Sequence, residues 1–226
     1  AKQIYHWMYR HKIQDISQMK NIPKSIRDSI EENYILKTLS VESIQESKNE
    51  DTKKILFRTI DNQFIESVSM IDNNLHTICI SSQVGCNVDC KFCATGIMGF
   101  KRNLSCGEIL DQLIEINVLR DEPVTNIVYM GMGEPFLNYS NVIKSAEILN
   151  HSKGFNFGAK RITISTVGIV PKIKKFIDEK RKYKLAISLN ASDNKTRSSI
   201  IPINKKWPIE DIISVSYKYA KTYKDK

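Results

Sequence analysis

The sequence has no long apolar run. No segment approaches the roughly 18 apolar residues that a membrane-spanning helix needs, and the N-terminus lacks the apolar stretch of a secretion signal. Five cysteines among 226 residues do not make a disulfide scaffold, and the chain shows neither internal repeats nor low-complexity segments. These absences argue against a membrane protein and a disulfide-rich secreted domain. With 41% hydrophobic residues for a core, the sequence predicts a soluble, cytoplasmic protein.

Acidic residues are the minority among the charged ones. Lys and Arg number 34 against 25 Asp and Glu, which gives a formal charge of +9. Ten basic residues against two acidic ones fall within 153–184, and six against two fall within 1–30. This excess favours a polyanionic partner such as nucleic acid. The chain is also rich in Lys, Ile and Asn, so a compositional bias of its source is the alternative explanation.

The first 76 residues divide into a helical part and a strand-forming part. Within residues 1–37, apolar residues recur at near-helical spacing and Pro23 suits the start of a second helix. Residues 38–76 change to period two, and Asp61-Asn62 separates two alternating stretches as a hairpin turn does. We therefore expect a small helical domain over 1–37 and a β-meander over 38–76.

From residue 77 to 226, predicted strands and helices alternate. The expected strands are 77–82, 126–132, 161–166 and 185–189, and the expected helices are 105–119, 139–149, 171–179 and 209–223. Four β-α units in series predict an α/β fold with a parallel sheet or barrel. The active site of such a fold lies at the C-terminal ends of the strands. A cysteine-rich loop and "GMGEP" both fall at such ends.

Three cysteines crowd into "GCNVDCKFCATG", where Cys86, Cys90 and Cys93 have the spacing C-x3-C-x2-C. In a reducing compartment such a cluster indicates metal binding or catalysis. A structural zinc site takes four ligands, and the fourth would have to be Cys79, Cys106 or a histidine because no second C-x2-C pair exists. An iron–sulfur cubane held by three thiolates leaves one iron open to a substrate or cofactor. Three merely buried cysteines are the weakest of these interpretations.

The cysteine motif, with Phe92 before its last cysteine, resembles the signature of radical S-adenosylmethionine (SAM) enzymes. "ICISSQVGCNVDCKFCATG", "NIVYMGMGEP", "RITISTVGIVP", "LAISLNAS" and "IPINKKWPI" occur in the order and spacing of the RlmN/Cfr family of RNA adenine methyltransferases. The resemblance covers nearly the whole chain. It implies that residues 77–226 form a radical SAM partial (β/α)6 barrel with about four β-α units present. It also makes the helical domain over 1–37 a candidate for RNA binding.

Two positions indicate the branch of the family. Pro135 and Val84 are similar to the C2-methylating RlmN branch, whereas Cfr enzymes tend to carry alanine where Pro135 stands. A Cfr-like C8 methyltransferase is the first alternative, and another radical SAM enzyme that shares only the cluster motif is the second. A non-catalytic zinc or RNA-binding module is the alternative outside the enzymes. Iron and sulfide in an anaerobic preparation, without zinc, would exclude that last alternative.

The resemblance implies a 4Fe-4S cluster on Cys86, Cys90 and Cys93, with SAM at the open iron. The residues that match cofactor contacts are Gly133, Glu134, Ser165, Ser188, Leu189 and Asn190. Glu134 matches the residue that holds the cofactor's amino group, where a carboxylate suits an ammonium. Asn190 replaces the family's usual histidine, so it keeps a hydrogen-bonding contact and cannot titrate near neutrality. Outside this family, "MGMGEP" would be interpreted as a glycine-rich turn that caps a strand.

Glu66 and Cys79 match catalytic residues of the family. In "QFIESVSM", Glu66 shares a face with Phe64 and Val68, where a carboxylate is out of place unless that face is exposed. The family implies instead that Glu66 faces the cofactor cavity, contacts the target adenine and accepts its proton. Cys79 matches a cysteine that helps to resolve the covalent protein–RNA intermediate, although alone it would be a small buried hydrophobe. The resemblance also implies a disulfide bond.

The RlmN branch implies methylation of C2 of an adenine in 23S rRNA and of an adenine beside the tRNA anticodon. The expected enzyme is a monomer that uses two SAM molecules per turnover, a methyl-cysteine intermediate and an electron donor such as flavodoxin or ferredoxin. The methyl-carrying cysteine of the family would lie beyond residue 226, and the last two β-α units of the barrel are not in the sequence. The resemblance therefore implies a fragment that cannot turn over by itself.

Overall fold

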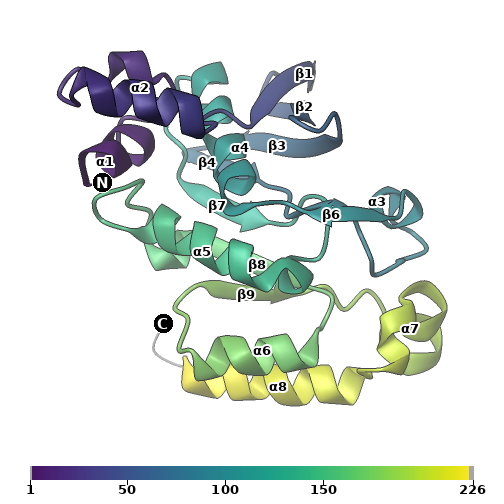
Figure 1. Cartoon of the computed structure of the whole chain (residues 1–226). Helices are drawn as coiled ribbons and strands as arrows, with labels where there is room; N and C mark the ends of the chain where they lie inside the picture. The colour runs from purple at the N-terminus through teal and green to yellow at the C-terminus, as the bar shows by residue number, and fades with distance from the viewer. Residues whose placement is uncertain (1, 224–226) are drawn as a thin grey trace.

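One seven-stranded sheet runs through the molecule, with the strand order β1-β2-β3-β4-β7-β8-β9 (Figure 1). The computed structural model describes residues 2–223. The strands are β1 (Leu39–Glu46), β2 (Thr52–Thr59), β3 (Phe64–Asp72), β4 (Leu75–Cys79), β7 (Asn126–Tyr129), β8 (Ile162–Thr166) and β9 (Lys184–Ile187). Neighbours from β1 to β4 are antiparallel, and neighbours from β4 to β9 are parallel. The predicted α/β fold is confirmed.

Helices follow the parallel strands in the predicted order. They are α1 (Lys2–Tyr9), α2 (Lys24–Asn33), α3 (Ala94–Ile97), α4 (Cys106–Leu119), α5 (Tyr139–Asn150), α6 (Val170–Asp178), α7 (Asn194–Ile200) and α8 (Ile209–Thr222), with the 3-10 turns η1 (Ile16–Gln18), η2 (Pro135–Asn138), η3 (Ala159–Arg161) and η4 (Pro202–Lys205). The predicted bounds of α4, α5, α6 and α8 agree within one residue. The short elements α3 and α7, and the hairpin β5 (Gln83–Gly85) with β6 (Phe100–Asn103), were not predicted. They are too short to show a period.

The parallel strands bury one face under helices and leave the other face partly open. Ile78, Ile127 and Ile164 point to the helix-covered side and are fully buried. Thr77 and Val128 point to the opposite side and are only half-buried, as expected for side chains that alternate along a strand. On the covered side α4 packs against α5, and α6 packs against α8 (Figure 1). Space for a ligand is therefore found on the open side and at the strand ends.

The β-meander is part of the same sheet, because β3 pairs with β4 and places Val68 opposite Cys79. Its buried face carries Phe57 and Ile65, which are fully buried. Glu66 and Val68 lie on the other, half-exposed face of β3. That face continues the open side of the parallel sheet, since directly paired residues point to the same side. The carboxylate of Glu66 thus lies on an exposed face.

The N-terminal helices have a small core of their own, built on Ile16, Met19 and Ile22. Polar contacts hold this unit against α4: Gln14 Nε2 donates to Asp111 Oδ1 at 2.9 Å, and Lys37 Nζ lies 2.9 Å from Glu115 Oε1. Within residues 2–223, no helix has both the length and the apolarity to cross a membrane. The division of the chain at residues 37 and 76 stays a prediction.

Candidate active site

A cavity of about 410 Å³ lies at the C-terminal ends of β7, β8 and β9, where the fold predicts an active site. Its lining joins the cysteine loop to these strand ends. The sequence-predicted residues that line it are Cys86, Cys90, Cys93, Gly133, Glu134, Ser165, Ser188 and Asn190. The sequence did not single out the apolar part of the wall, formed by Val88, Tyr129, Met130, Val167 and Ile187. Such residues look like ordinary strand residues in the sequence.

The β5–β6 hairpin closes the loop that carries the three cysteines. Gly85 has a φ of +72°, and a Cβ atom there would lie 1.7 Å from the Gly99 carbonyl oxygen, so only glycine fits. The Cys86 backbone N–H donates to that same oxygen at 3.2 Å. Within the loop, the Cys93 backbone N–H donates to the Cys90 carbonyl at 3.1 Å. This backbone geometry turns all three thiols toward one cavity.

The thiol set fits an iron–sulfur cluster better than a single metal ion. Burial raises the pKa of the Cys86 thiol and raises that of Cys90 to about 11, so both need a bound cation to become thiolates at neutral pH. Among residues 2–223, no three His, Cys, Asp or Glu side chains are grouped to hold one metal ion. A zinc ion requires its ligands to converge on one point, whereas three thiolates of a cubane bind three separate irons.

Glu134 is a buried carboxylate beside the three thiols. Gly133 precedes it with a φ of +95°, and a Cβ atom there would lie 2.5 Å from Gln83 Cβ. Glu134 is 4% exposed and accepts hydrogen bonds from the backbone N–H groups of Phe136 at 2.9 Å and Val167 at 2.8 Å. Burial raises the pKa of Glu134 to about 7. No side-chain cation among residues 2–223 is paired with it, so the arrangement suits an ammonium group of a ligand.

Four further predicted residues come from the ends of β8 and β9. Ser165 Oγ lies 3.2 Å from Ser188 Oγ, and both side chains line the cavity. Asn190 also lines it and has a φ of +62°, a left-handed conformation that asparagine tolerates. Leu189 is not among the lining residues, and its carbonyl accepts a hydrogen bond from Arg197 Nε at 2.9 Å. Its cofactor contact stays a prediction.

The two predicted catalytic residues lie on the open side of the sheet and are not among the side chains that line the cavity. Glu66 is 43% exposed, and its Oε1 lies 3.0 Å from Lys54 Nζ. Its backbone carbonyl accepts from Ser81 Oγ at 2.6 Å, close to the C-terminal end of β4. Burial raises the pKa of the Cys79 thiol to about 11. The catalytic roles of both residues stay predictions.

The expected disulfide bond is wrong for the cysteines of this chain, because all five are free thiols. Cys79 belongs to β4, and Cys106 begins α4. Both are held by regular structure, and a disulfide needs the two Cβ atoms within about 4.5 Å of each other. The other three cysteines share the loop at the cavity and are suited to ligation instead.

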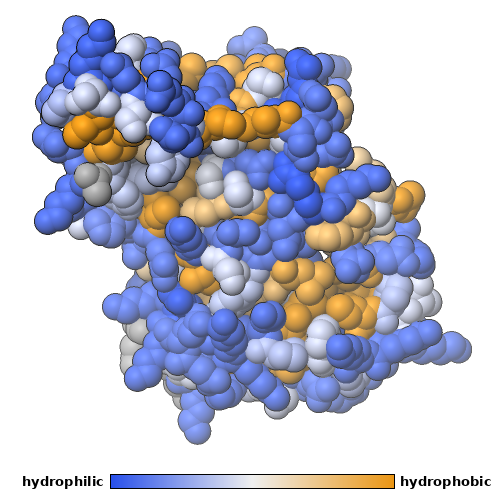
Figure 2. All heavy atoms as spheres, in the orientation of Figure 1, coloured by the Kyte–Doolittle hydropathy of each residue, from blue (hydrophilic) through white to orange (hydrophobic). Residues whose placement is uncertain are grey.

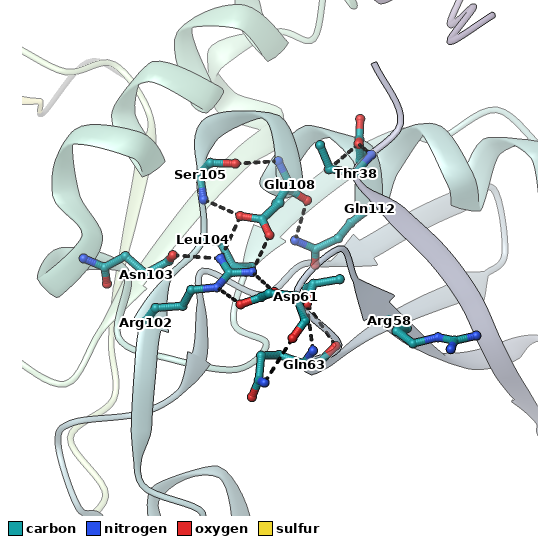
Figure 3. A network of polar contacts seen from close by, with 12 residues as sticks. Thr38, Arg58, Asp61, Gln63, Arg102, Asn103, Leu104, Ser105, Glu108 and Gln112 are labelled. Carbon is teal, nitrogen blue, oxygen red and sulfur yellow. Dashed lines mark hydrogen bonds and ion pairs between the residues drawn. The ribbon is translucent and has the colours of Figure 1, made fainter. Parts of the chain in front are cut away.

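A polar network that the sequence did not predict connects the β-meander to the hairpin of the cysteine loop (Figure 3). Arg102, on β6, donates to Asp61 Oδ1 at 2.7 Å and to Glu108 Oε1 at 2.7 Å. Glu108 also completes a capping box with Ser105 at the start of α4. Deeper inside, Gln112 accepts a hydrogen bond from the Ser81 backbone N–H at 2.7 Å. The network links the β2–β3 turn, the hairpin of the cysteine loop and α4.

Apolar side chains are exposed around the cysteine loop. Phe92, Ile97, Met98 and Phe100 are between 41% and 74% exposed. On the face shown in Figure 2, which is mostly hydrophilic, apolar atoms gather between β6 and α7. An exposed apolar patch beside a cavity is typical of a binding surface.

Two family models match this chain. The model described as the radical SAM superfamily matches residues 80–223, which include the cysteine loop and all the strand ends of the cavity. The model described as the ribosomal RNA large subunit methyltransferase N-terminal domain matches residues 1–36. That second match coincides with the N-terminal helices and their separate core.

Curated proteins and a solved structure are similar over nearly the whole chain. A "Probable dual-specificity RNA methyltransferase RlmN" of Dictyoglomus thermophilum is 46% identical over 97% of this chain and 64% of its own length. The protein of the same description from Bacillus velezensis is 39% identical over 98% of this chain and 62% of its own length. The crystal structure of a radical SAM methyltransferase from Sphaerobacter thermophilus has a TM-score of 0.92 and 41% identity, covering 98% of this chain and 66% of that one. The chain thus spans under two thirds of the length of these relatives.

Proposed function

Because this chain belongs to the radical SAM superfamily and, within it, to the RlmN family, we propose that it carries the radical chemistry of an RNA methyltransferase. The observation that carries the proposal is the cavity that three thiols and one buried carboxylate line together. Cys86, Cys90 and Cys93 would hold a 4Fe-4S cluster. When bound, that cluster supplies the electron that cleaves S-adenosylmethionine.

The remaining cavity residues bind and orient the cofactor. Glu134 places its carboxylate on the ammonium of SAM, and the backbone N–H groups of Phe136 and Val167 hold that carboxylate in place. The hydroxyls of Ser165 and Ser188 and the amide of Asn190, which also line the cavity, supply neutral hydrogen bonds. The apolar wall excludes water, which protects a reactive radical from side reactions.

The finer assignment is methylation of C2 of an adenine in 23S rRNA and of an adenine beside the tRNA anticodon. Two SAM molecules per turnover, a methyl-cysteine intermediate, and flavodoxin or ferredoxin as reductant belong to the same proposal, as do a monomeric state and a cytoplasmic location. Pro135 lines the cavity beside Glu134, and this position supports the C2 over the C8 branch. Glu66 would accept the adenine proton, and Cys79 would assist release of the product.

Anaerobic reconstitution with iron and sulfide tests the proposal on this chain. We expect a cluster that, with dithionite, converts SAM into 5′-deoxyadenosine and methionine. Replacement Cys93→Ala should abolish both the iron content and the cleavage. Cys106→Ala is the matched control, since it also removes one partly buried thiol and should leave both unchanged. Zinc without sulfide in the wild-type protein, or no cleavage by a fully loaded cluster, would contradict the proposal.

Methyl transfer needs a separate test, because the chain spans 64% of the length of the Dictyoglomus thermophilum relative. The chain can be joined to the part of that relative that follows the aligned region and incubated with 23S rRNA. Mass spectrometry of the nucleosides should then show 2-methyladenosine. A product methylated at C8 would favour the Cfr-like alternative, and loss of product in Glu66→Gln with cluster and SAM cleavage intact would support the role of Glu66.

A further inference from the structure

Arg197, on α7, is the largest fully buried side chain among residues 2–223, with 0% exposure. Charged side chains are almost never fully buried unless a partner neutralises them. The segment "NKTRSSI" gives no sign of this burial, because a basic residue in a short polar helix is normally solvated. A guanidinium buried in this way needs an explanation.

The three hydrogen-bond acceptors of Arg197 are all neutral. Its guanidinium donates to the carbonyls of Leu189 at 2.9 Å and Val167 at 2.5 Å, and to Asn204 Oδ1 at 2.6 Å. The acidic residues nearby on the chain are engaged elsewhere: Asp193 caps α7, and Glu210 accepts from Asn194. In the part of the chain that the structure describes, Arg197 forms no ion pair with a carboxylate. Its positive charge is therefore uncompensated.

The cysteine loop lies beside α7. The Lys91 backbone N–H donates at 2.9 Å to the carbonyl of Ile200, the last residue of α7. Lys91 directly follows Cys90. Val167, whose carbonyl accepts a hydrogen bond from the Arg197 guanidinium, lines the same cavity as Cys90. The group that can compensate Arg197 is thus a thiolate of the loop.

Arg197 also connects two strand ends of the site. Val167 follows β8, and its backbone N–H donates to Glu134 Oε2 at 2.8 Å while its carbonyl accepts from Arg197. Leu189 lies between the cavity-lining residues Ser188 and Asn190. The planar guanidinium, with its fixed donor geometry, therefore holds both strand ends in one arrangement.

We propose that Arg197 is a positioning cation of the cluster site, which clamps the ends of β8 and β9 and supplies the positive charge that balances the cluster and its thiolates. The proposal rests on the proposed function. Reduction adds one negative charge to a cluster, and a buried cation nearby stabilises that form more than solvent would. Arg197 therefore raises the reduction potential, in the manner of other groups that surround a metal centre and tune it.

The test is a potentiometric titration of the reconstituted cluster, followed by its EPR signal. Arg197→Gln removes the charge and should lower the reduction potential by about 59 mV, a tenfold change in the one-electron equilibrium. Arg197→Lys keeps the charge and loses the planar clamp, so its potential should stay near the wild-type value while its thermal stability falls. Lys205→Gln, an exposed cation on η4, is the matched control and should change neither quantity, because solvent screens its charge.

An unchanged potential in Arg197→Gln would overturn the proposal and leave Arg197 a structural residue. Equal losses of potential in Arg197→Gln and Arg197→Lys would overturn it as well, because the charge would then not matter. If Arg197→Gln fails to hold a cluster, Arg197→Lys decides: a retained potential supports the proposal and a lowered one overturns it. A wild-type chain that assembles no cluster would contradict the proposed function instead, which separates the two failures.

Discussion

At the scale of single residues, two glycines of this chain differ in whether a larger residue would fit in their place. Gly133, between the cavity and Gln83, has a φ of +95° and no room for a Cβ atom. Gly107, in the first turn of α4, has only Ser105 Oγ nearby, and a Cβ atom added to this glycine would lie 3.8 Å from that oxygen. The first glycine is needed for the turn that presents Glu134, and the second is a site where alanine fits.

Gly133→Ala should therefore lower the free energy of unfolding by about 2 kcal/mol or more, because strain and a clash with Gln83 act together. Gly107→Ala should raise it by up to about 1 kcal/mol, since alanine is the better helix former. Urea denaturation followed by circular dichroism measures both. Equal effects of the two substitutions would show that the conformation at Gly133 is not enforced.

Glu134 should make the stability of the cofactor-free protein depend on pH. Its pKa is raised from 4.5 to about 7, so the folded protein retains a proton that the unfolded chain has lost between these values. The contribution of the protonated Glu134 carboxyl group to the stability of the folded protein is fully present below about pH 4.5, and it is lost as the pH rises through 7. From about pH 5 to about pH 8, wild type should lose roughly 2 to 3 kcal/mol relative to Glu134→Gln.

Urea denaturation of both proteins at the two pH values gives this difference directly. Other titrating groups are present in both proteins and cancel in the comparison. A difference that stays constant, or that grows in favour of wild type as the pH rises, would show that the carboxylate is already ionised in the folded state at about pH 5.

At the scale of elements, the β2–β3 turn is held to β6 and α4 by one side chain, Arg102. Its two acidic partners differ in exposure, 49% for Asp61 and 10% for Glu108. Arg58, on the neighbouring strand β2, instead pairs with Glu42 in an exposed ion pair. Both arginines are visible in Figure 3. Arg102 thus represents a network that joins several elements, and Arg58 represents an ordinary surface ion pair.

Arg102→Ala should lower the free energy of unfolding by about 1 to 2 kcal/mol, because it leaves Glu108 in a partly buried position without its cation. Arg58→Ala should cost less than about 1 kcal/mol, as exposed ion pairs do. Chemical denaturation of the two variants checks the difference. Arg102→Ala should also slow cluster assembly, since β6 closes the cysteine loop, and an unchanged assembly rate would limit Arg102 to stability.

At the scale of the whole molecule, the basic side chains differ in their surroundings. Within the basic stretch 153–184, Lys175 and Arg181 are engaged with acidic side chains. Lys153 is different, because it lines two cavities beside α1. There the rings of Tyr5 and His151 pack edge to face, with their centroids 5.3 Å apart. Basic and aromatic side chains together suit contact with single-stranded RNA.

Lys153→Glu should therefore weaken binding of an rRNA fragment and reduce the slope of log affinity against log salt by about 1. Lys48→Glu changes the net charge by the same amount on the exposed turn between β1 and β2, and it should leave the slope nearly unchanged. Fluorescence anisotropy over a range of salt concentrations measures both. Equal effects of the two variants would mean that net charge alone attracts the RNA.

Local patterns in the sequence determined most of the architecture. The change from period two to alternating strand and helix patterns predicted the meander, the four β-α units and the bounds of α4, α5, α6 and α8. The order of these units also placed the cysteine loop and Glu134 at the same strand ends, because parallel strands share one C-terminal edge. Periodicity and the order of elements can be read along the chain, so predicting these features needed no knowledge of side-chain packing.

Tertiary structure alone decided what surrounds each side chain. The exposure of Glu66 depends on which elements cover β3, and its carboxylate is 43% exposed on the open side of the sheet. The burial of Arg197 depends on Val167, Leu189 and Asn204 meeting around α7. These contacts join residues that are distant in the chain or lie in different elements. Burial and charge compensation are set by such contacts, and a sequence pattern over a few residues carries no record of them.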